Sequence, residues 1–270
     1  MCYNSTNVWL LSIAGALIAL HLNLSQQLGR SDLFGCALLF WVTVSFLIWQ
    51  KRDRLFLKSD AFSSFAGTAI LALLLYKSTH LFDGDFFLRL YPLIALFGWG
   101  LLASGIKGLK QYRSEMFLLG FLAIPWEGIY VFDLSLLTAK FSTFVLWILG
   151  FEVTRNGVWI VLPSGSIEVY NGCSGLRTMV QLLGLSWIVL AIAIADWKQK
   201  ILLPIAAILI GFTVNGVRVA LMAVLVSLED LDRFNYWHVG NGSLIFSVIA
   251  VLFFALIGTR LMSISWGNLE

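Results

Sequence analysis

Long apolar runs recur along the whole of this 270-residue chain, and they limit its fold more than any other feature. Each run has about 17 to 25 residues, the length that an α-helix needs to cross the hydrocarbon core of a bilayer. Hydrophobic residues make up 59% of the chain and charged residues only 12%, so little is left for a soluble domain. The pattern predicts a polytopic membrane protein that is surrounded by lipids. The net charge of +3 is small and gives no indication of a nucleic-acid partner.

We expect an all-α fold with about eight transmembrane helices in a single integral membrane domain, residues 1–270. The expected spans are 8–28, 33–49, 61–76, 87–105, 115–132, 174–195, 201–227 and 239–260. The second and third runs are the shortest, so seven spans remain an alternative. The first run lacks a preceding charged segment and a small-residue cleavage site, which indicates a retained helix rather than a cleaved signal peptide.

The basic residues between the spans predict the orientation of the chain, because cytoplasmic loops carry an excess of lysine and arginine. One alternating set of loops is rich in them and contains Lys51, Arg52, Arg54, Lys58, Lys107, Lys110, Arg113, Lys198, Lys200 and Arg260. The opposite set is longer, yet it holds fewer basic residues and most of the acidic ones. We therefore expect an inner-membrane protein with both termini in the cytoplasm. Cys173 then lies at the outer, periplasmic face.

The long external loop 133–173 has its own predicted structure. Leu134 to Leu149 reads as an apolar helix at the membrane interface. The segments 151–155 and 158–162 read as strands, and Asn156-Gly157 between them is typical of a type I′ hairpin turn. A third strand, 166–170, leads towards Cys173. We therefore expect a small external β-ribbon before the sixth span.

Cys173 is the residue of greatest interest, because it stands between this loop and an apolar helix. The positive end of the helix dipole and the charge of Arg177, one turn further on, are both expected to lower the pKa of the thiol. Gly172 and Gly175 on either side allow tight turns and close backbone approach. The other two cysteines, Cys2 and Cys36, form neither a disulfide framework nor a CxxC metal motif with it.

Four ionisable residues inside or beside the spans are expected at a similar level of the outer leaflet. They are Glu127, Arg177, Arg218 and His238. Arg218 lies about 13 Å below the outer end of the seventh span, because an α-helix rises 1.5 Å per residue. Charged groups are expensive in a membrane and indicate function or a buried pair. The alternatives are an inert thiol, an interfacial histidine and a structural Arg177–Glu127 pair.

A thiol with an imidazole beside it is the minimum for thiol acyl transfer. In that chemistry Cys173 attacks a peptide carbonyl, and His238 carries the proton to the leaving amine. Arg218 would stabilise the thiolate or the oxyanion, and Asn215, three residues earlier, could help to satisfy it. The backbone N–H groups of Ser174 and Gly175 are further oxyanion donors if a helix begins there.

Three segments together resemble the exosortase/archaeosortase family of membrane transpeptidases. They are Asn-Gly-Cys-Ser-Gly-Leu-Arg-Thr (171–178), Asn-Gly-Val-Arg-Val (215–219) and Trp-His-Val-Gly (237–240), so the catalytic motif region spans 171–242. The compact length and the strand-rich lead-in look most like the cyanobacterial branch, the cyanoexosortases. The resemblance implies Cys173 as nucleophile, Arg218 as the essential arginine and His238 as the third member. It implies a supporting role for Arg177 and matches no position to Glu127.

The resemblance also implies the substrate, an exported protein with a C-terminal sorting signal. Such a signal has a short Pro-Glu-Pro-like motif, a transmembrane helix and a basic tail, and the protein is transferred through a thioester on the cysteine. Two other functions remain open: a transporter or non-catalytic component of envelope polysaccharide export, and a thiol redox protein. No cofactor is expected. One outer histidine without a cluster of ligands does not predict a metal site.

Overall fold

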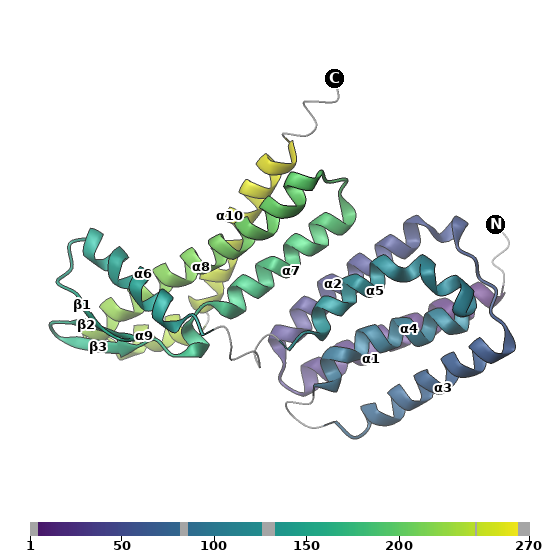
Figure 1. The fold of residues 1–270 in the computed structure, drawn as a ribbon. Helices are drawn as coiled ribbons and strands as arrows, with labels where there is room; N and C mark the ends of the chain where they lie inside the picture. The colour runs from purple at the N-terminus through teal and green to yellow at the C-terminus, as the bar shows by residue number, and fades with distance from the viewer. Residues whose placement is uncertain (1–4, 82–85, 126–132, 241, 264–270) are drawn as a thin grey trace. The chain divides into compact units, whose positions relative to one another are not determined.

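The computed structural model describes residues 5–81, 86–125, 133–240 and 242–263. The chain folds into two compact units, residues 1–125 and 126–270 (Figure 1). The extent of a single membrane domain over 1–270 stays a prediction. The second unit contains Cys173, Arg218 and His238, and the candidate site can therefore be described within it alone.

The first unit is helical throughout its described part. It contains α1 (Ser5–Gln27), α2 (Ser31–Gln50), α3 (Ala61–Ser78), α4 (Phe87–Gly108) and α5 (Arg113–Ala123), with short 3-10 turns at Arg52–Arg54 and Leu109–Tyr112. Helix α4 contacts α1, α3 and α5. Its closest approach is to α3, where a Cβ on Gly67 would lie 2.7 Å from the carbonyl oxygen of Gly98. Small residues thus let two apolar helices pack backbone to backbone.

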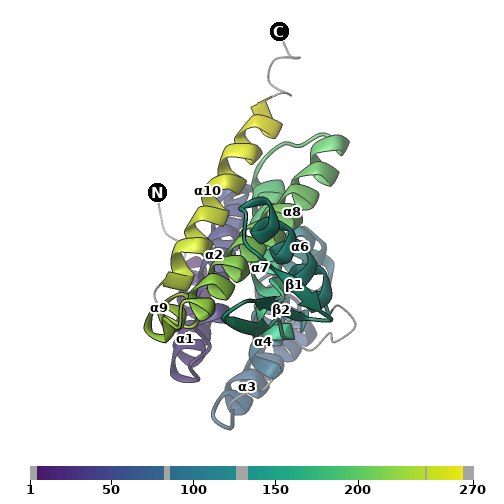
Figure 2. The same ribbon diagram turned by 90° about the vertical axis from the view of Figure 1, so that its left-hand side faces the viewer.

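The second unit combines helices with one small sheet. Its elements are α6 (Ser135–Ile148), β1 (Thr154–Asn156), β2 (Trp159–Leu162), β3 (Gly165–Glu168), the 3-10 turn η5 (Asn171–Cys173), α7 (Leu176–Ile192), α8 (Trp197–Ser227), α9 (Leu231–His238) and α10 (Gly242–Ser263). Helix α8 contacts α6, α7, α9, α10 and β3 and forms the centre of the unit. Figures 1 and 2 show α6, the sheet and α9 gathered around the end of α8 that leads into α9.

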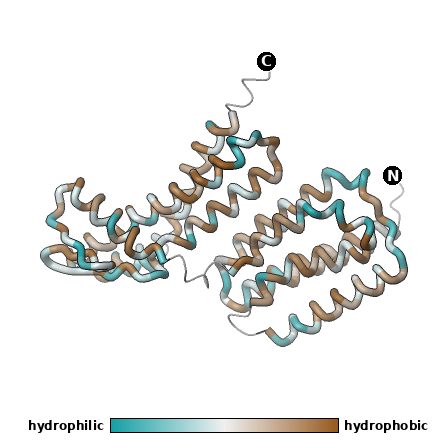
Figure 3. The backbone as a smooth tube through the Cα atoms, in the orientation of Figure 1, coloured by the Kyte–Doolittle hydropathy of each residue, from teal (hydrophilic) through white to brown (hydrophobic). Residues whose placement is uncertain are grey.

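Six helical segments of the described chain are long and apolar enough to cross a membrane, which agrees with a polytopic membrane protein. They are Val8–Gln27, Leu33–Gln50, Ala61–Ser78, Phe87–Ala123, Trp197–Ser227 and Gly242–Met262. Two apolar helices, α6 and α7, are shorter. Figure 3 shows hydrophobic residues along the helices and hydrophilic ones mainly at the connections. The count of eight spans stays a prediction.

The expected fifth span, 115–132, differs from the structure in its described part. Helix α5 ends at Ala123, and Ile124 is already extended, with φ −75° and ψ 125°. Pro125 follows it, and the ring of a proline disfavours helical geometry in the residue before it. Residues 126–132, and with them Glu127, lie outside the described residues.

The small β-ribbon expected in loop 133–173 is present as an antiparallel sheet with the order β1-β2-β3. Its first turn differs from the expected type I′ form. Asn156 pairs with Trp159, so the two turn residues are Gly157 and Val158. Only Gly157 of these has a positive φ, of 61°, whereas type I′ requires positive φ at both turn positions.

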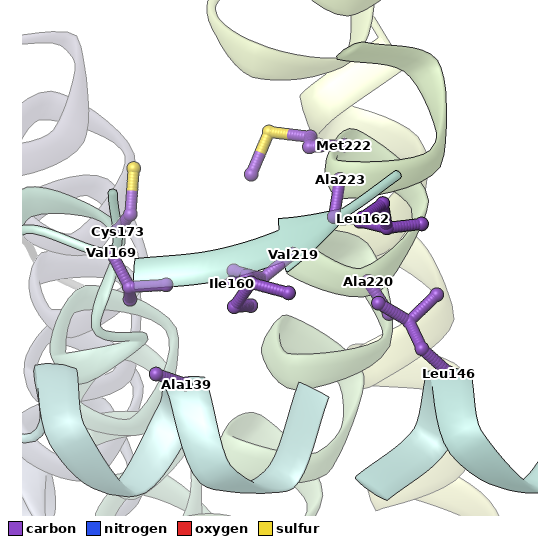
Figure 4. Close-up of a cluster of buried hydrophobic side chains, with 10 residues drawn as sticks. All are labelled: Ala139, Leu146, Ile160, Leu162, Val169, Cys173, Val219, Ala220, Met222 and Ala223. Carbon is purple, nitrogen blue, oxygen red and sulfur yellow. The ribbon is translucent and has the colours of Figure 1, made fainter. Parts of the chain in front are cut away.

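The hydrophobic core of the second unit joins the sheet to α6 and α8. Ile160 and Leu162 of β2 pack with Val219 and Ala223 of α8, and Ala139 and Leu146 close the cluster from α6. Figure 4 shows Cys173 as a member of the same cluster. The sheet is therefore fixed to α8, and the thiol lies at the edge of a packed apolar region.

Candidate active site

The backbone around Cys173 forms a tight turn between the sheet and α7. The N–H of Cys173 donates to the carbonyl of Tyr170 at 2.8 Å, and the N–H of Ser174 donates to Asn171 at 3.1 Å. A Cβ on Gly172 would lie 2.5 Å from the ring of Tyr170, so this ring can fold back only over a glycine. Because Ser174 N–H is already bonded, it is not the oxyanion donor that we expected.

Side chains of two helices, α6 and α8, donate hydrogen bonds to the backbone of this turn. The Asn215 side chain on α8 donates to the carbonyl of Cys173 at 2.9 Å, and the Thr138 hydroxyl on α6 donates to the carbonyl of Ser174 at 2.8 Å. Gly175 has φ +87°, and a Cβ there would lie 2.8 Å from the Asn215 amide. We expected Asn215 to support Arg218, whereas in the structure its amide donates to the cysteine turn and positions it.

Arg218 holds the segment that carries His238. Its Nε donates to the carbonyl of Trp237 at 3.2 Å and its Nη2 to the carbonyl of His238 at 2.7 Å. These carbonyls lie at the end of α9, where a helix leaves its last C=O groups unpaired and carries partial negative charge. The guanidinium thus caps α9 and fixes the position of the imidazole.

Helix α9 itself corrects the expectation that His238 opens the span 239–260. The chain rises about 13 Å along α8 from Arg218 to Ser227, and the eight residues of α9 carry it back about 12 Å. Helix α9 packs against α8, and this return brings His238 to the level of Arg218. The last helix begins only at Gly242.

The thiol and the imidazole are in contact. Cys173 Sγ lies 3.4 Å from His238 Nε2, and the Tyr170 hydroxyl lies 3.5 Å from the same nitrogen. The imidazole ring lies between two aromatic rings, that of Phe234 at 5.1 Å and that of Tyr170 at 6.4 Å between centroids. When Nε2 accepts from the thiol or the hydroxyl, it is unprotonated and the ring proton lies on Nδ1.

Burial decides the charge states of this pair. It raises the pKa of the Cys173 thiol above its usual value, and the Tyr170 hydrogen bond and the charge of Arg218 offset this only in part. Burial, together with Arg218, lowers the pKa of His238. The lowered thiol pKa that we expected is therefore wrong. Helix α7 begins only at Leu176, and Arg218 rather than Arg177 is the charge that acts on the thiol.

A cavity of about 230 Å³ opens beside the thiol. Cys173 and His238 line it together with residues of β3, α8 and α9. The site thus brings a thiol, an imidazole and an adjoining cavity together. In the described part of the chain, no three His, Cys, Asp or Glu side chains come together in a way that could hold a metal ion.

Of the two remaining residues expected to support the site, only Arg177 is among the described ones. Arg177 lies exposed in the first turn of α7, and its charge acts on Tyr170 and Arg218. The expected pairing of Arg177 with Glu127 involves a residue outside the described ones.

Tyr170 is a site residue that we did not predict from the sequence. The signal was its place three residues before Cys173, because a 3-10 turn brings residues i and i+3 onto one edge. Its hydroxyl reaches both the thiol and the imidazole. The hydrogen bond to Cys173, the charge of that thiolate and, to a smaller extent, burial raise the pKa of this phenol, which keeps it a proton donor.

These observations define an integral membrane protein with a thiol–imidazole pair at one end of a helical unit. Residues 28–255 match the family described as transmembrane exosortase, and the chain belongs to this family of membrane cysteine peptidases and transpeptidases. No curated protein and no solved structure matches the chain.

Proposed function

We propose that this protein is a membrane cysteine transpeptidase that cleaves C-terminal sorting signals of exported proteins through a thioester on Cys173. The observation that carries the proposal is the 3.4 Å contact between Cys173 Sγ and His238 Nε2, on a segment that Arg218 holds by two hydrogen bonds. A nucleophile, its base and the group that orients the base are the parts that acyl transfer requires.

The reaction begins from a neutral pair, since the pKa of the thiol is raised and that of the imidazole is lowered. As Sγ attacks the scissile carbonyl carbon, the thiol proton passes to His238 Nε2. The resulting oxyanion lies within the field of Arg218, whose Nη1 takes no part in the hydrogen bonds to α9. The Tyr170 hydroxyl is a second donor near the same place.

The tetrahedral intermediate then collapses to a thioester. The C–N bond breaks, and the imidazolium returns its proton to the leaving amine nitrogen. In the second half-reaction an acceptor nucleophile attacks the thioester carbonyl and loses its proton to His238. Sγ leaves as thiolate and takes that proton back, which regenerates the free enzyme.

The substrate class comes from the family. It is an exported protein that ends in a Pro-Glu-Pro-like motif, a transmembrane helix and a basic tail, and the resemblance favours the cyanobacterial branch. A basic tail retained in the cytoplasm would place the motif at the outer face, where the charge pattern predicts Cys173.

The direct test is processing of a tagged precursor that carries such a signal and is co-expressed with the enzyme. Wild type should release the mature protein, whereas Cys173→Ala should leave the precursor uncut at an unchanged enzyme level in the membrane. Cys36→Ala, on α2 of the first unit, is the matched control and should process normally. Arg218→Lys should also fail, because an ammonium cannot reproduce the planar two-point contact with Trp237 and His238. Full processing by Cys173→Ala would refute the proposal.

A further inference from the structure

Strand β3 is an edge strand with unused hydrogen-bonding groups. The sheet order β1-β2-β3 leaves one side of β3 without a neighbouring strand. Val169 N–H bonds to Val158, and paired residues of an antiparallel ladder alternate between bonded and non-bonded pairs. Ile167 therefore bonds to β2, while the N–H and C=O groups of Ser166 and Glu168 are directed away from it.

The cavity beside Cys173 runs along this free edge. Residues 166–170 all line it, although successive side chains of a strand point to opposite faces of the sheet. Ser166, Ile167 and Glu168 belong to β3, and Val169 and Tyr170 directly follow it, so a space that touches all five lies along the edge of the strand and its continuation. At one end it reaches Cys173 and His238, and at the other Gly165 packs closely against Val226.

The opposite wall of the cavity is apolar. Met222 and Val226 of α8 and Phe234 of α9 face the strand across it. An edge that offers main-chain donors and acceptors, opposite a wall that accepts apolar side chains, is the surface that binds an extended peptide by strand addition. Exposed strand edges pair readily with a further chain.

We infer that this cavity is a groove for the substrate. It binds the substrate segment on the N-terminal side of the scissile bond as a fourth strand, parallel to β3. This inference rests on the proposed function. The substrate runs from the exported part towards its membrane helix, and β3 likewise runs towards Cys173 and the apolar helix α7. Hydrogen bonds to the backbone of Ser166 and Glu168 position the substrate so that its scissile carbonyl lies beside Cys173 Sγ.

Strand addition also explains why a Pro-x-Pro motif is compatible with such a groove. The N–H and C=O of one strand residue point to the same side, and residues two apart share that side. Both prolines can then face away from β3, where no N–H is needed, while the residue between them bonds to the edge.

The test uses the purified full-length protein and two thiol reagents, with the modified cysteine located by mass spectrometry. One reagent is iodoacetamide; the other is an apolar tetrapeptide chloromethyl ketone, prepared unmodified and N-methylated at one residue at a time. We expect the peptide to modify Cys173 faster than iodoacetamide. Each N-methyl group that faces β3 should lower the peptide rate about tenfold, because it removes one hydrogen bond. N-methyl groups on residues two apart should lower the modification rate alike, whereas an N-methyl group on the residue between them should leave the rate unchanged.

A pair of variants tests the apolar wall. Val226→Trp fills the groove, whereas Val217→Trp makes the same change at an exposed position of α8. Val226→Trp should abolish the faster modification of Cys173 by the peptide reagent. Its iodoacetamide rate should stay that of the wild type, which would show that the thiol is still intact and accessible. Val217→Trp should behave as wild type.

The possible failures are distinguishable. Strand addition would be overturned if all N-methyl groups lowered the rate equally, or if none of them did. The proposed function would still stand in that case, provided that the wild type processed the precursor. A peptide advantage that survived in Val226→Trp would overturn the groove as its site. A wild type that processed no precursor would instead contradict the proposed function itself.

Discussion

At the scale of single residues, the reactivity of Cys173 depends on two opposing effects. Its side chain is only 7% exposed, and burial disfavours the thiolate. The Tyr170 hydroxyl and the charge of Arg218 favour it, yet burial is the larger effect. The thiol and the imidazole are therefore both neutral near pH 7, so in the proposed reaction the proton would move during attack rather than before it.

Tyr170→Phe tests this balance. Because the hydroxyl lowers the pKa of Cys173, its removal should raise that pKa further and move the pH profile of iodoacetamide modification to higher pH. One hydrogen bond contributes about 0.5–1.5 kcal/mol, so the rate at pH 7.5 should fall about two- to tenfold. Tyr236→Phe, on α9, is the matched control and should leave the profile unchanged. An unshifted profile in Tyr170→Phe would contradict a role for this hydroxyl.

At the scale of elements, the site depends on how closely α7 and α8 pack. A Cβ on Gly211 of α8 would lie 2.8 Å from the backbone of Met179 on α7. One helical turn further along α8, Asn215 holds the cysteine turn that leads into α7. Any side chain at 211 therefore separates the helix that carries Arg218 from the segment that carries the thiol.

Gly211→Val should consequently impair the site without touching a reacting group. Overpacking destabilises by about 1–3 kcal/mol, which predicts a lower melting temperature in detergent and slower modification of Cys173 by the peptide reagent. Gly120→Val is the control, because a Cβ at that position meets nothing within 4 Å. Equal melting temperatures for the two variants would show that the α7–α8 contact tolerates the extra volume.

At the scale of the whole molecule, charge is distributed unequally along the second unit. Lys198 and Lys200 lie at the start of α8 and Arg260 near the end of α10, whereas the sheet, α9 and the acidic residues Glu229, Asp230 and Asp232 lie at the opposite end. The 31 residues of α8 separate these ends by about 46 Å. The positive-inside rule then predicts the site at the outer face.

Introduced cysteines can test that orientation. Asn156→Cys, at the exposed hairpin, should react with a membrane-impermeant maleimide added to intact spheroplasts. Lys198→Cys should react only after permeabilisation, because the charge pattern places it in the cytoplasm. The parent chain supplies the background from its own cysteines. The reverse labelling pattern would invert the predicted topology.

Much of the architecture follows from the sequence because membrane spans are a local property. Apolar length predicted α1 to α4, α8 and α10 to within a few residues, and alternating strands around Gly157 and Pro163 predicted the sheet. The end of α5 at Ala123 was missed although Pro125 marks it. The separate helix α9 was missed because its eight residues are amphipathic, and so short a helix depends on its contacts with α8 and on its caps, Asp230 and Arg218.

The amino-acid sequence alone was enough to predict a polytopic membrane protein that resembles the exosortase family, and it pointed to Cys173, Arg218 and His238. Their relation depended on the tertiary structure. The return of α9 along α8 brings the imidazole to 3.4 Å from the thiol, and the last carbonyls of α9 accept two hydrogen bonds from Arg218. Packing also reverses the predicted pKa shift of Cys173, because desolvation depends on every neighbour of a group, whereas sequence shows only the nearest along the chain.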